Sequence, residues 1–419
     1  MAKIFPTASI TYTTEAGDAS RLLSPPFDVI TEDDAARLRA LSPYNAVRLV
    51  LPEGPVPDRY QLAADRLNDW LASGILARSR RESLWVYAQE FSHGGQQRAV
   101  RRALLCAVEL APLDSGEIFP HEHTHRGPKE DRLALMKSCC AQLSPIFFIA
   151  RDPDGALHDL LVKASGVKPG MEARTEDDVA HALHELPARH ERAALTLGAG
   201  RGLLIADGHH RYETALELAR QLTDRPASRQ VLAAIVSDRD RGLILQATHR
   251  RIEGLPAGWR DVLAGSFEIE AGSNDPRSLA DEVRRRGGAT IGALGLGRPD
   301  SAGILLKRPL PAAQDRARLS MAEAGIASVV LDRLILRRFT GRDADAAAAD
   351  GTLSYHQDPE AARLSGSLAA GPAAEAGLFL LPPVRLEDIW AVAGAGVRLP
   401  PKSTYFAPKM PSGLLFRPL

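Results

Sequence analysis

The sequence predicts an α/β or α+β protein in which mixed sheets pack against helices. Short apolar runs of strand length, such as 203–206 and 231–237, occur along the same chain as an amphipathic segment at 58–72 with helical spacing. Two further strand-like runs, 84–91 and 99–110, are separated by a polar, glycine-containing segment, as in a β-hairpin. Strands and helices that alternate in this way indicate a mixed fold.

The length of 419 residues predicts two domains, because a single hydrophobic core seldom supports so long a chain. Glycine, proline and polar residues become frequent from 254 to 275, where we place the boundary. The predicted N-terminal domain is 1–253 and the predicted C-terminal α/β domain is 254–419. We expect the last stretch of the chain, 399–410, to return to the functional site.

The composition argues against two classes of partner. The 52 basic and 52 acidic residues balance, so no positive field favours nucleic acid. The chain shows no run of about 18 apolar residues and no signal-peptide pattern, and its three cysteines are a poor disulfide framework. We therefore expect a cytoplasmic protein that acts on a small-molecule substrate and does not bind a membrane.

The first polar cluster lies near the N-terminus. Two prolines stiffen a loop that carries Asp28, and a helix is expected to begin after Thr31, a good N-terminal cap. Asn45 and Arg48 follow, where the run 46–51 is predicted to be a strand. These polar side chains border regular elements that would hold them in place.

The second polar cluster runs from His121 to Arg132 and precedes a helix predicted to reach about Cys140. Pro128 suits the first turn of that helix, because a helix start makes no use of the N–H that proline lacks. The next element along the chain is a buried strand predicted at 146–149.

The third cluster lies in the stretch 202–218, around which we expect the chain to be organised. An apolar run predicts a strand up to residue 206, and helical spacing begins at Tyr212, so Asp-Gly-His-His-Arg at 207–211 joins the two. Gly208 permits backbone angles that other residues avoid, and the first N–H groups of a helix have no partner within it. An arginine and two histidines at such a helix start predict an anion site, most naturally for phosphate.

The rest of the chain is predicted to alternate helices with strands and to end in a fourth polar cluster, 402–409. The expected helices are 279–286, 327–339 and 386–393, and the expected strands are 243–248, 289–294, 304–307 and 378–381.

Together the four clusters contain the groups that phosphoryl transfer uses, namely cationic and histidine donors, a helix start and carboxylates. The residues expected to bind the cofactor are Asp207, Gly208, His209, His210, Arg211, Lys129, Arg132, Lys402, Ser403, Thr404 and Lys409. The residues expected to bind the substrate are Asn45, Arg48, His121 and Thr124.

A metal site is the alternative interpretation of the second cluster. His121, His123 and His125 alternate, and with Glu122 they would serve a metal-dependent hydrolase or phosphatase. The spacing is short of specific, so we assign no metal ligand. The P-loop, the dinucleotide fingerprint and the esterase elbow are absent from the sequence.

In their order and number, these motifs resemble the bacterial and archaeal DUF1015 family over nearly the whole chain, from residue 4 to residue 417. Phe27 stands where the family usually has tyrosine, and the resemblance implies no particular activity. The matching segments are Ser-Pro-Pro-Phe-Asp-Val-Ile (24–30), Ser-Pro-Tyr-Asn-Ala-Val-Arg-Leu (42–49), Pro-His-Glu-His-Thr (120–124), Gly-Pro-Lys-Glu-Asp-Arg-Leu (127–133), Ala-Asp-Gly-His-His-Arg-Tyr-Glu-Thr-Ala (206–215) and Lys-Ser-Thr-Tyr-Phe-Ala-Pro-Lys (402–409).

The segment 207–211 is also similar to a nucleotide-phosphate motif at a helix start in the ParB and sulfiredoxin superfamily, which includes a free serine kinase. This similarity implies a ParB/sulfiredoxin-like core in which 208–211 hold nucleotide phosphates. The genes that often accompany family members imply a small hydroxylated substrate such as serine. A ParB-like nucleotide-responsive regulator is a further alternative.

The leading hypothesis is therefore a small-molecule kinase or other phosphotransferase that binds ATP or ADP with Mg²⁺. Glu122 is the first choice for the general base and Asp28 the second, because a carboxylate accepts the proton of an attacking hydroxyl. His210 is the third catalytic candidate. Mg²⁺ is expected because nucleotide phosphates usually bring it.

Overall fold

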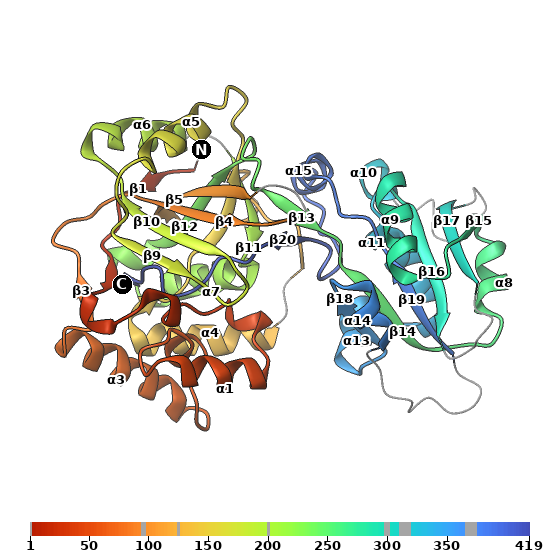
Figure 1. Ribbon diagram of the computed structural model, residues 1–419, viewed down its shortest axis with the longest axis horizontal. Coiled ribbons are helices and arrows are strands. Elements are labelled where there is room, and N and C mark those ends of the chain that lie inside the picture. Colours follow the sequence, from red (N-terminus) through yellow and green to blue (C-terminus); the bar gives the residue numbers. More distant parts are fainter. Residues whose placement is uncertain are drawn as a thin grey trace. The chain divides into compact units, whose positions relative to one another are not determined.

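The computed structural model describes residues 2–93, 98–123, 126–198, 202–296, 302–309, 320–364 and 375–419. Contacts between residues divide the chain into two compact units, whose elements are labelled in Figure 1. The first unit comprises Met1–Pro120, Thr124–Ile244 and Pro408–Leu419, and the second comprises His121–His123 and Leu245–Ala407. The two domains expected from the sequence, divided after residue 253, stay a prediction.

The first unit is built on a mixed sheet to which nine strands of the described chain contribute, in the order β6-β11-β8-β12-β5-β4-β10-β9, with β1 paired to β5. β12 runs parallel to β8 and antiparallel to β5, so parallel and antiparallel pairs meet in one sheet. The strands are β1 (Ile4–Phe5), β4 (Trp85–Phe91), β5 (Ala99–Glu109), β6 (Ile118–Phe119), β8 (Ile146–Ala150), β9 (Met171–Arg174), β10 (Ala180–Glu185), β11 (Leu203–Asp207) and β12 (Gln230–Ser237).

Helices and short strand pairs complete the first unit. The helices are α1 (Glu32–Leu41), α2 (Val47–Val50), α3 (Asp58–Ala72), α4 (Arg126–Cys139), α5 (Ala156–Ala164), α6 (Ala188–Gly198) and α7 (His209–Gln221), with 3-10 turns η1 (Thr14–Ala16), η2 (Ala19–Arg21), η3 (Phe27–Val29) and η4 (Pro226–Arg229). The paired strands are β2 (Ile10–Tyr12) with β3 (Leu76–Arg78), and β7 (Ala141–Gln142) with β21 (Arg417–Pro418).

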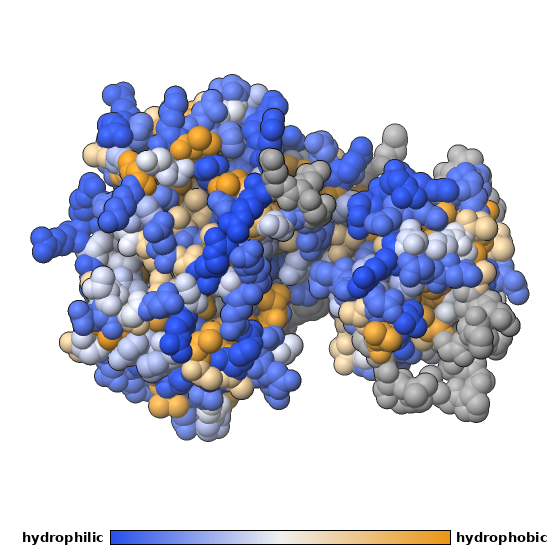
Figure 2. Space-filling model, viewed as in Figure 1, coloured by the Kyte–Doolittle hydropathy of each residue, from blue (hydrophilic) through white to orange (hydrophobic). Residues whose placement is uncertain are grey.

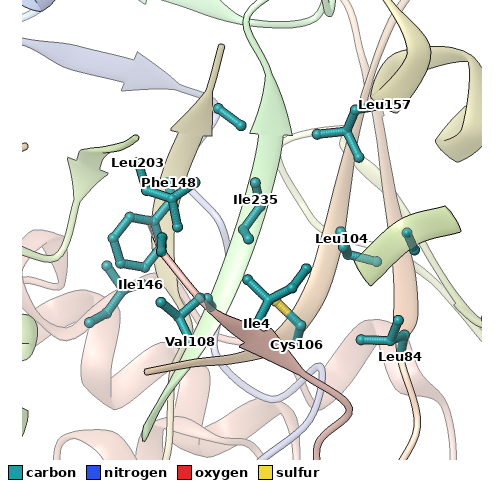
Figure 3. Packing of buried hydrophobic residues seen from close by; sticks show 14 of the residues in the cluster. Ile4, Leu84, Leu104, Cys106, Val108, Ile146, Phe148, Leu157, Leu203 and Ile235 are labelled. Carbon is teal, nitrogen blue, oxygen red and sulfur yellow. The ribbon is translucent and has the colours of Figure 1, made fainter. Parts of the chain in front are cut away.

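The main core of the first unit lies between the sheet and helices α5, α6 and α7. Figure 3 shows side chains of this cluster, among them Phe148 of β8 and Ile235 of β12, which are fully buried. Leu157 of α5 and Tyr212 of α7 belong to the same cluster. The apolar runs that predicted these strands therefore supply the surface against which the helices pack.

The second unit contains a six-stranded sheet in the described part of the chain, in the order β15-β17-β16-β19-β14-β18. Its strands are β14 (His249–Leu255), β15 (Phe267–Gly272), β16 (Ile291–Leu296), β17 (Gly303–Pro309), β18 (Leu353–His356) and β19 (Glu375–Leu380). Its helices are α8 (Trp259–Ala264), α9 (Pro276–Arg286), α10 (Met321–Ala324), α11 (Ala327–Leu331), the π-helical turn η6 (Asp332–Leu336), α12 (Arg337–Thr340), α13 (Ala344–Ala349), α14 (Pro359–Leu364) and α15 (Leu386–Gly394). β13 (Ile244–Gln246) and β20 (Tyr405–Ala407) form a separate two-stranded sheet.

The predicted fold class is confirmed, because mixed sheets and helices make up both units. The helix predicted at 58–72 is α3, and its buried residues, including Leu67 and Trp70, join those of α4 in a second cluster. The strand predicted at 243–248 forms only over Ile244–Gln246.

The strand predicted at 46–51 is wrong, because this run forms the short helix α2. The Asn45 side chain explains the difference. Its Oδ1 accepts a hydrogen bond from the backbone N–H of Val47 at 2.9 Å, and its Nδ2 donates to the carbonyls of Arg21 and Leu23 at 2.8 and 3.0 Å. These contacts bend the chain into a helical turn that apolar periodicity alone does not reveal.

No helix in the described ranges is long and apolar enough to cross a membrane. On the face drawn in Figure 2, hydrophilic side chains predominate and hydrophobic ones lie in small groups. Scattered apolar side chains of this kind are ordinary on a protein surface.

Replacement of Asn45 by alanine is expected to lower the free energy of unfolding by about 3 kcal/mol, because it leaves two buried carbonyls and one N–H without their partner. Urea denaturation of the full chain measures this. Asn68→Ala, at an exposed position of α3, serves as the control and should change the free energy by less than about 0.5 kcal/mol. Equal stability of the two variants would contradict the structural role of Asn45.

Candidate functional site

The third cluster forms the turn between β11 and α7, as the sequence predicted. Gly208 caps the helix start with φ 98° and ψ 27°, and no side chain accepts a capping hydrogen bond there. A Cβ at this position would come within 3.0 Å of the Arg211 guanidinium, so both the backbone angle and the space favour glycine. The Tyr212 N–H makes the first bond within the helix, to the Gly208 carbonyl at 2.9 Å. The N–H groups before it point out of the helix start.

Asp207 joins two cations from distant parts of the chain at this turn. Its Oδ2 accepts a hydrogen bond from Arg211 Nη2 at 2.7 Å, and its Oδ1 accepts one from Lys409 Nζ at 2.5 Å. All three side chains are mostly buried. Burial would raise the pKa of Asp207, but Lys409 and Arg211 outweigh it and hold that pKa well below its usual range.

The backbone around Lys409 is held by a second pair of buried side chains. Gln89 Nε2 donates to the Lys409 carbonyl at 2.9 Å, and Arg101 Nη2 donates to Gln89 Oε1 and to the Pro408 carbonyl. Arg101 is 1% exposed, and this burial lowers its pKa to about 10. Arg101 and Gln89 therefore position the segment that delivers Lys409.

The sequence did not lead us to Arg101 and Gln89, although one signal was present. Both residues are buried in the strands β5 and β4, where buried polar side chains are costly unless they are paired. The register places them opposite each other, as Gln89↔Arg101. An arginine at a buried position of a strand is thus a signal for a long-range partner.

Other predicted cofactor contacts lie on the helices beside this turn. Lys129 of α4 forms an ion pair with Glu213 of α7. Arg132 is buried, donates to Asp131 and to the Val50 carbonyl, and stacks over the Phe27 ring. These contacts are sufficient to explain why Arg132 is buried, and they give it a structural role.

The imidazole of His209 is mostly buried, whereas His210 is intermediate in exposure. The His210 carbonyl accepts a hydrogen bond from Thr214 Oγ1 at 2.7 Å, which stabilises the first turns of α7. His210 is therefore the more accessible of the two predicted histidine donors.

The predicted substrate contacts of the first cluster have framework partners. Asn45 is fully buried in the contacts described above. Arg48 donates to the carbonyls of Ser42 and Arg39, at 3.4 and 2.8 Å. Asp28 lies in the 3-10 turn η3 and is exposed, which leaves its carboxylate accessible to solvent.

Several other predicted site residues lie in the second unit. Glu122 Oε1 accepts a hydrogen bond from the backbone N–H of Lys402 at 2.9 Å, and His121 Nε2 lies 2.8 Å from Thr404 Oγ1. Leu399 pairs with Glu122 in a parallel β-bridge. Residues of the second and fourth clusters therefore meet here, through Glu122 and Lys402.

Arg250 organises this part of the second unit and was not found from the sequence. Its guanidinium donates to the Lys402 and Thr248 carbonyls, at 2.9 and 2.7 Å, and lies over the Tyr355 ring at 4.5 Å. Burial lowers the pKa of Arg250 to about 10. Lys402 itself adopts φ 56°, a left-handed angle rare for residues with a Cβ, and its side chain is exposed.

Ser403 is buried and donates from Oγ to the Pro400 carbonyl at 2.6 Å. Thr124 and His125 lie outside the described residues. Within the described ranges, no group of three or more histidine, cysteine, aspartate or glutamate side chains is placed to hold a metal ion. The described residues thus contain no set of ligands for the alternative, a metal site built on histidines.

The charges at the turn 207–211 agree with the anion site that the sequence predicts, which stays a prediction. Two cations, Arg211 and Lys409, face one carboxylate, and the start of α7 adds the positive end of a helix dipole. In the second unit, a backbone N–H orients one oxygen of the Glu122 carboxylate. The convergence of all four clusters on one site stays a prediction.

Comparison with known proteins gives one family and several distant structures. The profile of a family described as "Protein of unknown function (DUF1015)" matches residues 4–308. No curated protein matches the chain.

Among solved structures, free serine kinase in complex with AMP is 14% identical with a TM-score of 0.35, covering 72% of this chain and 86% of that chain. A mutant of free serine kinase in complex with ADP has the same identity and TM-score, covering 75% and 91%. SbnI from Staphylococcus aureus, truncated at the C-terminus, is 13% identical with a TM-score of 0.34, covering 73% and 84%.

Replacement of Lys409 by glutamine is expected to make the protein unfold at a higher pH during acid titration. The pKa of Asp207 is lower in the folded protein than in the unfolded chain. The ionised carboxylate therefore stabilises the folded protein fully at pH values above the unfolded-state pKa. This stabilisation is lost as the pH falls through the folded-state pKa. Without Lys409 the folded-state pKa rises, so this loss begins at higher pH. Circular dichroism during acid titration measures the midpoint.

Lys3→Gln is the control for this titration, because Lys3 pairs with Glu109 on the surface at 2.8 Å and should leave the midpoint unchanged. An acid midpoint for Lys409→Gln equal to that of the native protein would show that Lys409 does not control Asp207.

Proposed function

We propose that this chain, which belongs to the DUF1015 family, binds nucleotide phosphates at the turn 207–211 and transfers a phosphoryl group to a small hydroxyl compound such as serine. The observation that carries the proposal is the pairing of Asp207 with both Arg211 and Lys409 beside the start of α7. This arrangement holds two cations in fixed positions at a helix N-terminus.

Phosphate suits this turn better than a neutral ligand for two reasons. The N–H groups that precede the first helical hydrogen bond point toward a ligand at the helix start, and the helix dipole favours negative charge there. Arg211 and Lys409 add charge-assisted donors, which are stronger than neutral ones. A nucleotide is favoured over free phosphate by the similarity of 207–211 to the superfamily motif described above.

Mg²⁺, bound to the phosphates of the nucleotide, would neutralise charge on them. The described residues provide no set of three acidic or histidine ligands for a metal ion, so we assign no protein ligand to it. The contribution of this chain is to orient the phosphates through 207–211 and Lys409, and to supply a proton acceptor.

In the proposed transfer, the hydroxyl oxygen of the acceptor forms a bond to the terminal phosphorus of ATP. The bond from that phosphorus to the bridging oxygen breaks, and ADP leaves with the electron pair. The proton of the hydroxyl passes to a carboxylate. Glu122 is our first candidate for this acceptor, because the Lys402 N–H fixes one of its oxygens, and the exposed Asp28 is the second.

The first test is nucleotide binding by the full chain, measured by thermal unfolding and calorimetry with ATP, ADP and adenosine. ADP at 100 times its dissociation constant is expected to add about 2.7 kcal/mol to the free energy of unfolding, whereas adenosine, without phosphates, should add little. Lys409→Gln should weaken ADP binding about tenfold or more, because it removes a charge-assisted contact.

Lys3→Gln again serves as the matched control and should bind ADP as the native protein does. Absence of binding by both ATP and ADP would overturn the proposal. Equal binding of ADP and adenosine would show that the phosphates are not what the protein recognises.

The second test is transfer of labelled phosphate from ATP to L-serine, L-threonine and glycerol. Glu122→Gln is expected to reduce the rate by about a hundredfold or more while leaving ADP affinity unchanged, because a general base acts on the chemical step.

Glu387→Gln, an exposed change of the same kind on α15, is the control for transfer and should retain the native rate. If Glu122→Gln stays active and Asp28→Asn does not, the proton acceptor is Asp28. If no acceptor receives label, the protein binds nucleotides without transferring phosphate to these compounds.

A further inference from the structure

A polar pocket lies within the second unit and shares no residue with the turn 207–211 or with Lys409. Its volume is about 200 Å³. Three arginines, Arg333, Arg337 and Arg398, and the carboxylates of Asp332 and Asp343 are among the residues that line it. A pocket lined by both signs of charge suits a ligand that itself carries both.

Asp332 is the most unusual residue of this pocket. It is 3% exposed, and its Oδ2 accepts a hydrogen bond from Arg337 Nε at 3.1 Å. Its Oδ1 is buried and accepts no hydrogen bond of ordinary length and angle from a described residue, although the Ala344 N–H lies close enough to lower the pKa of the carboxyl group. A buried carboxylate oxygen without such a bond is costly, so it points to a donor supplied by a ligand.

The electrostatics of Asp332 support the same interpretation. Burial raises its pKa, and this effect outweighs Arg337, Arg333 and the N–H of Ala344, which lower it. A cationic N–H donor placed at Oδ1 would offset the cost of burying the charge. An ammonium group supplies such a donor.

The backbone at Asp332 is also unusual, because the residue begins the π-helical turn η6 between α11 and α12. Single π-helical turns inserted between α-helical segments are rare and occur often at functional sites. Asp332 and Arg333 of this turn line the pocket, together with Arg337 at the start of α12.

Two other charged residues that line the pocket have partners that hold them in position. Arg333 Nη2 lies 3.7 Å from Glu323 Oε1. Asp343 caps α13, since its Oδ1 accepts from the Ala346 N–H at 2.9 Å. Both arginine side chains on η6 and α12 remain partly exposed, at 35% for Arg333 and 48% for Arg337, so a bound anionic group can reach them.

Size and charge favour a small ligand with groups of both signs in this pocket. A volume of about 200 Å³ equals the liquid volume of about seven waters, which is below the range for nucleotides and drug-sized ligands. The described residues hold no cluster that could ligate a metal ion. A simple anion would meet the buried Asp332 carboxylate, which disfavours it.

We infer that this pocket binds a small zwitterion of the α-amino acid class, with its ammonium group on Asp332 and its carboxylate on the arginines. The ammonium group would donate to Oδ1 of Asp332, and the bound carboxylate would accept hydrogen bonds from Arg333 and Arg337. This inference does not depend on nucleotide binding or on phosphoryl transfer.

The test is calorimetry on the full chain without nucleotide, with L-serine, L-alanine and L-aspartate as probes. Propionate and ethylamine, each with one of the two charged groups, are the half-molecule comparisons. At least one amino acid is expected to bind, and propionate and ethylamine should bind at least tenfold more weakly, because each leaves one side of the pocket without its partner.

Asp332→Asn is expected to weaken amino-acid binding at least tenfold, and Arg333→Gln, at a partly exposed position, should weaken it as well. Asp281→Asn, an exposed change of the same kind on α9, is the matched control and should leave binding unchanged. Lys409→Gln should also retain amino-acid affinity, which separates this result from the nucleotide site.

Two outcomes would overturn the inference. In the first, none of the three amino acids binds at millimolar concentration. In the second, an amino acid binds with equal affinity to the native protein, to Asp332→Asn and to Arg333→Gln, which would place its site elsewhere.

Discussion

The buried carboxylate of Asp207 imposes the constraint on which the candidate nucleotide site depends. A carboxylate removed from water must be paired, and Asp207 takes one cation from its own turn, Arg211, and one from the end of the chain, Lys409. Because Gln89 and Arg101 hold the backbone beside Lys409, the pairing links the strand-to-helix turn to the main sheet. The last segment, Pro408–Leu419, accordingly belongs to the first unit and not to the second.

The second unit uses a buried cation in a similar way. Arg250 binds the carbonyl of Lys402, whose N–H binds Glu122, so the chain around 402 is held from both sides. The left-handed angle of Lys402 directs these two backbone groups and leaves the side chain exposed. A buried charged side chain that donates hydrogen bonds to the backbone of a loop fixes the conformation of that loop more firmly than a surface ion pair does. The reason is that water competes less for these hydrogen bonds in the protein interior.

Asp207 and Asp332 show how one side chain acquires different chemistry from its surroundings. Two cations pair with Asp207 and lower its pKa, so the carboxylate holds both cations in place. A single arginine pairs with one oxygen of Asp332, and burial raises its pKa, which makes the other oxygen a place for a cationic donor. The proposed phosphate ligand therefore goes with Asp207, where pairing with cations outweighs burial. The proposed ammonium ligand goes with Asp332, where burial outweighs pairing.

The local sequence by itself determined those helices and strands whose apolar residues are regularly spaced and whose ends are marked by turn or capping residues. It predicted α3 at its observed bounds, the β11–α7 turn with Gly208, and the hairpin of β4 and β5. It failed for 46–51, where the Asn45 side chain bends an apolar run into a helix, and it did not show the π-helical turn at Asp332. Tertiary structure alone decided the partners Gln89–Arg101, Arg250–Lys402 and Asp207–Lys409, since residues up to 320 positions apart pair only after the sheets have formed. A charge in a sequence shows that a partner is needed, but burial and register decide which group it is.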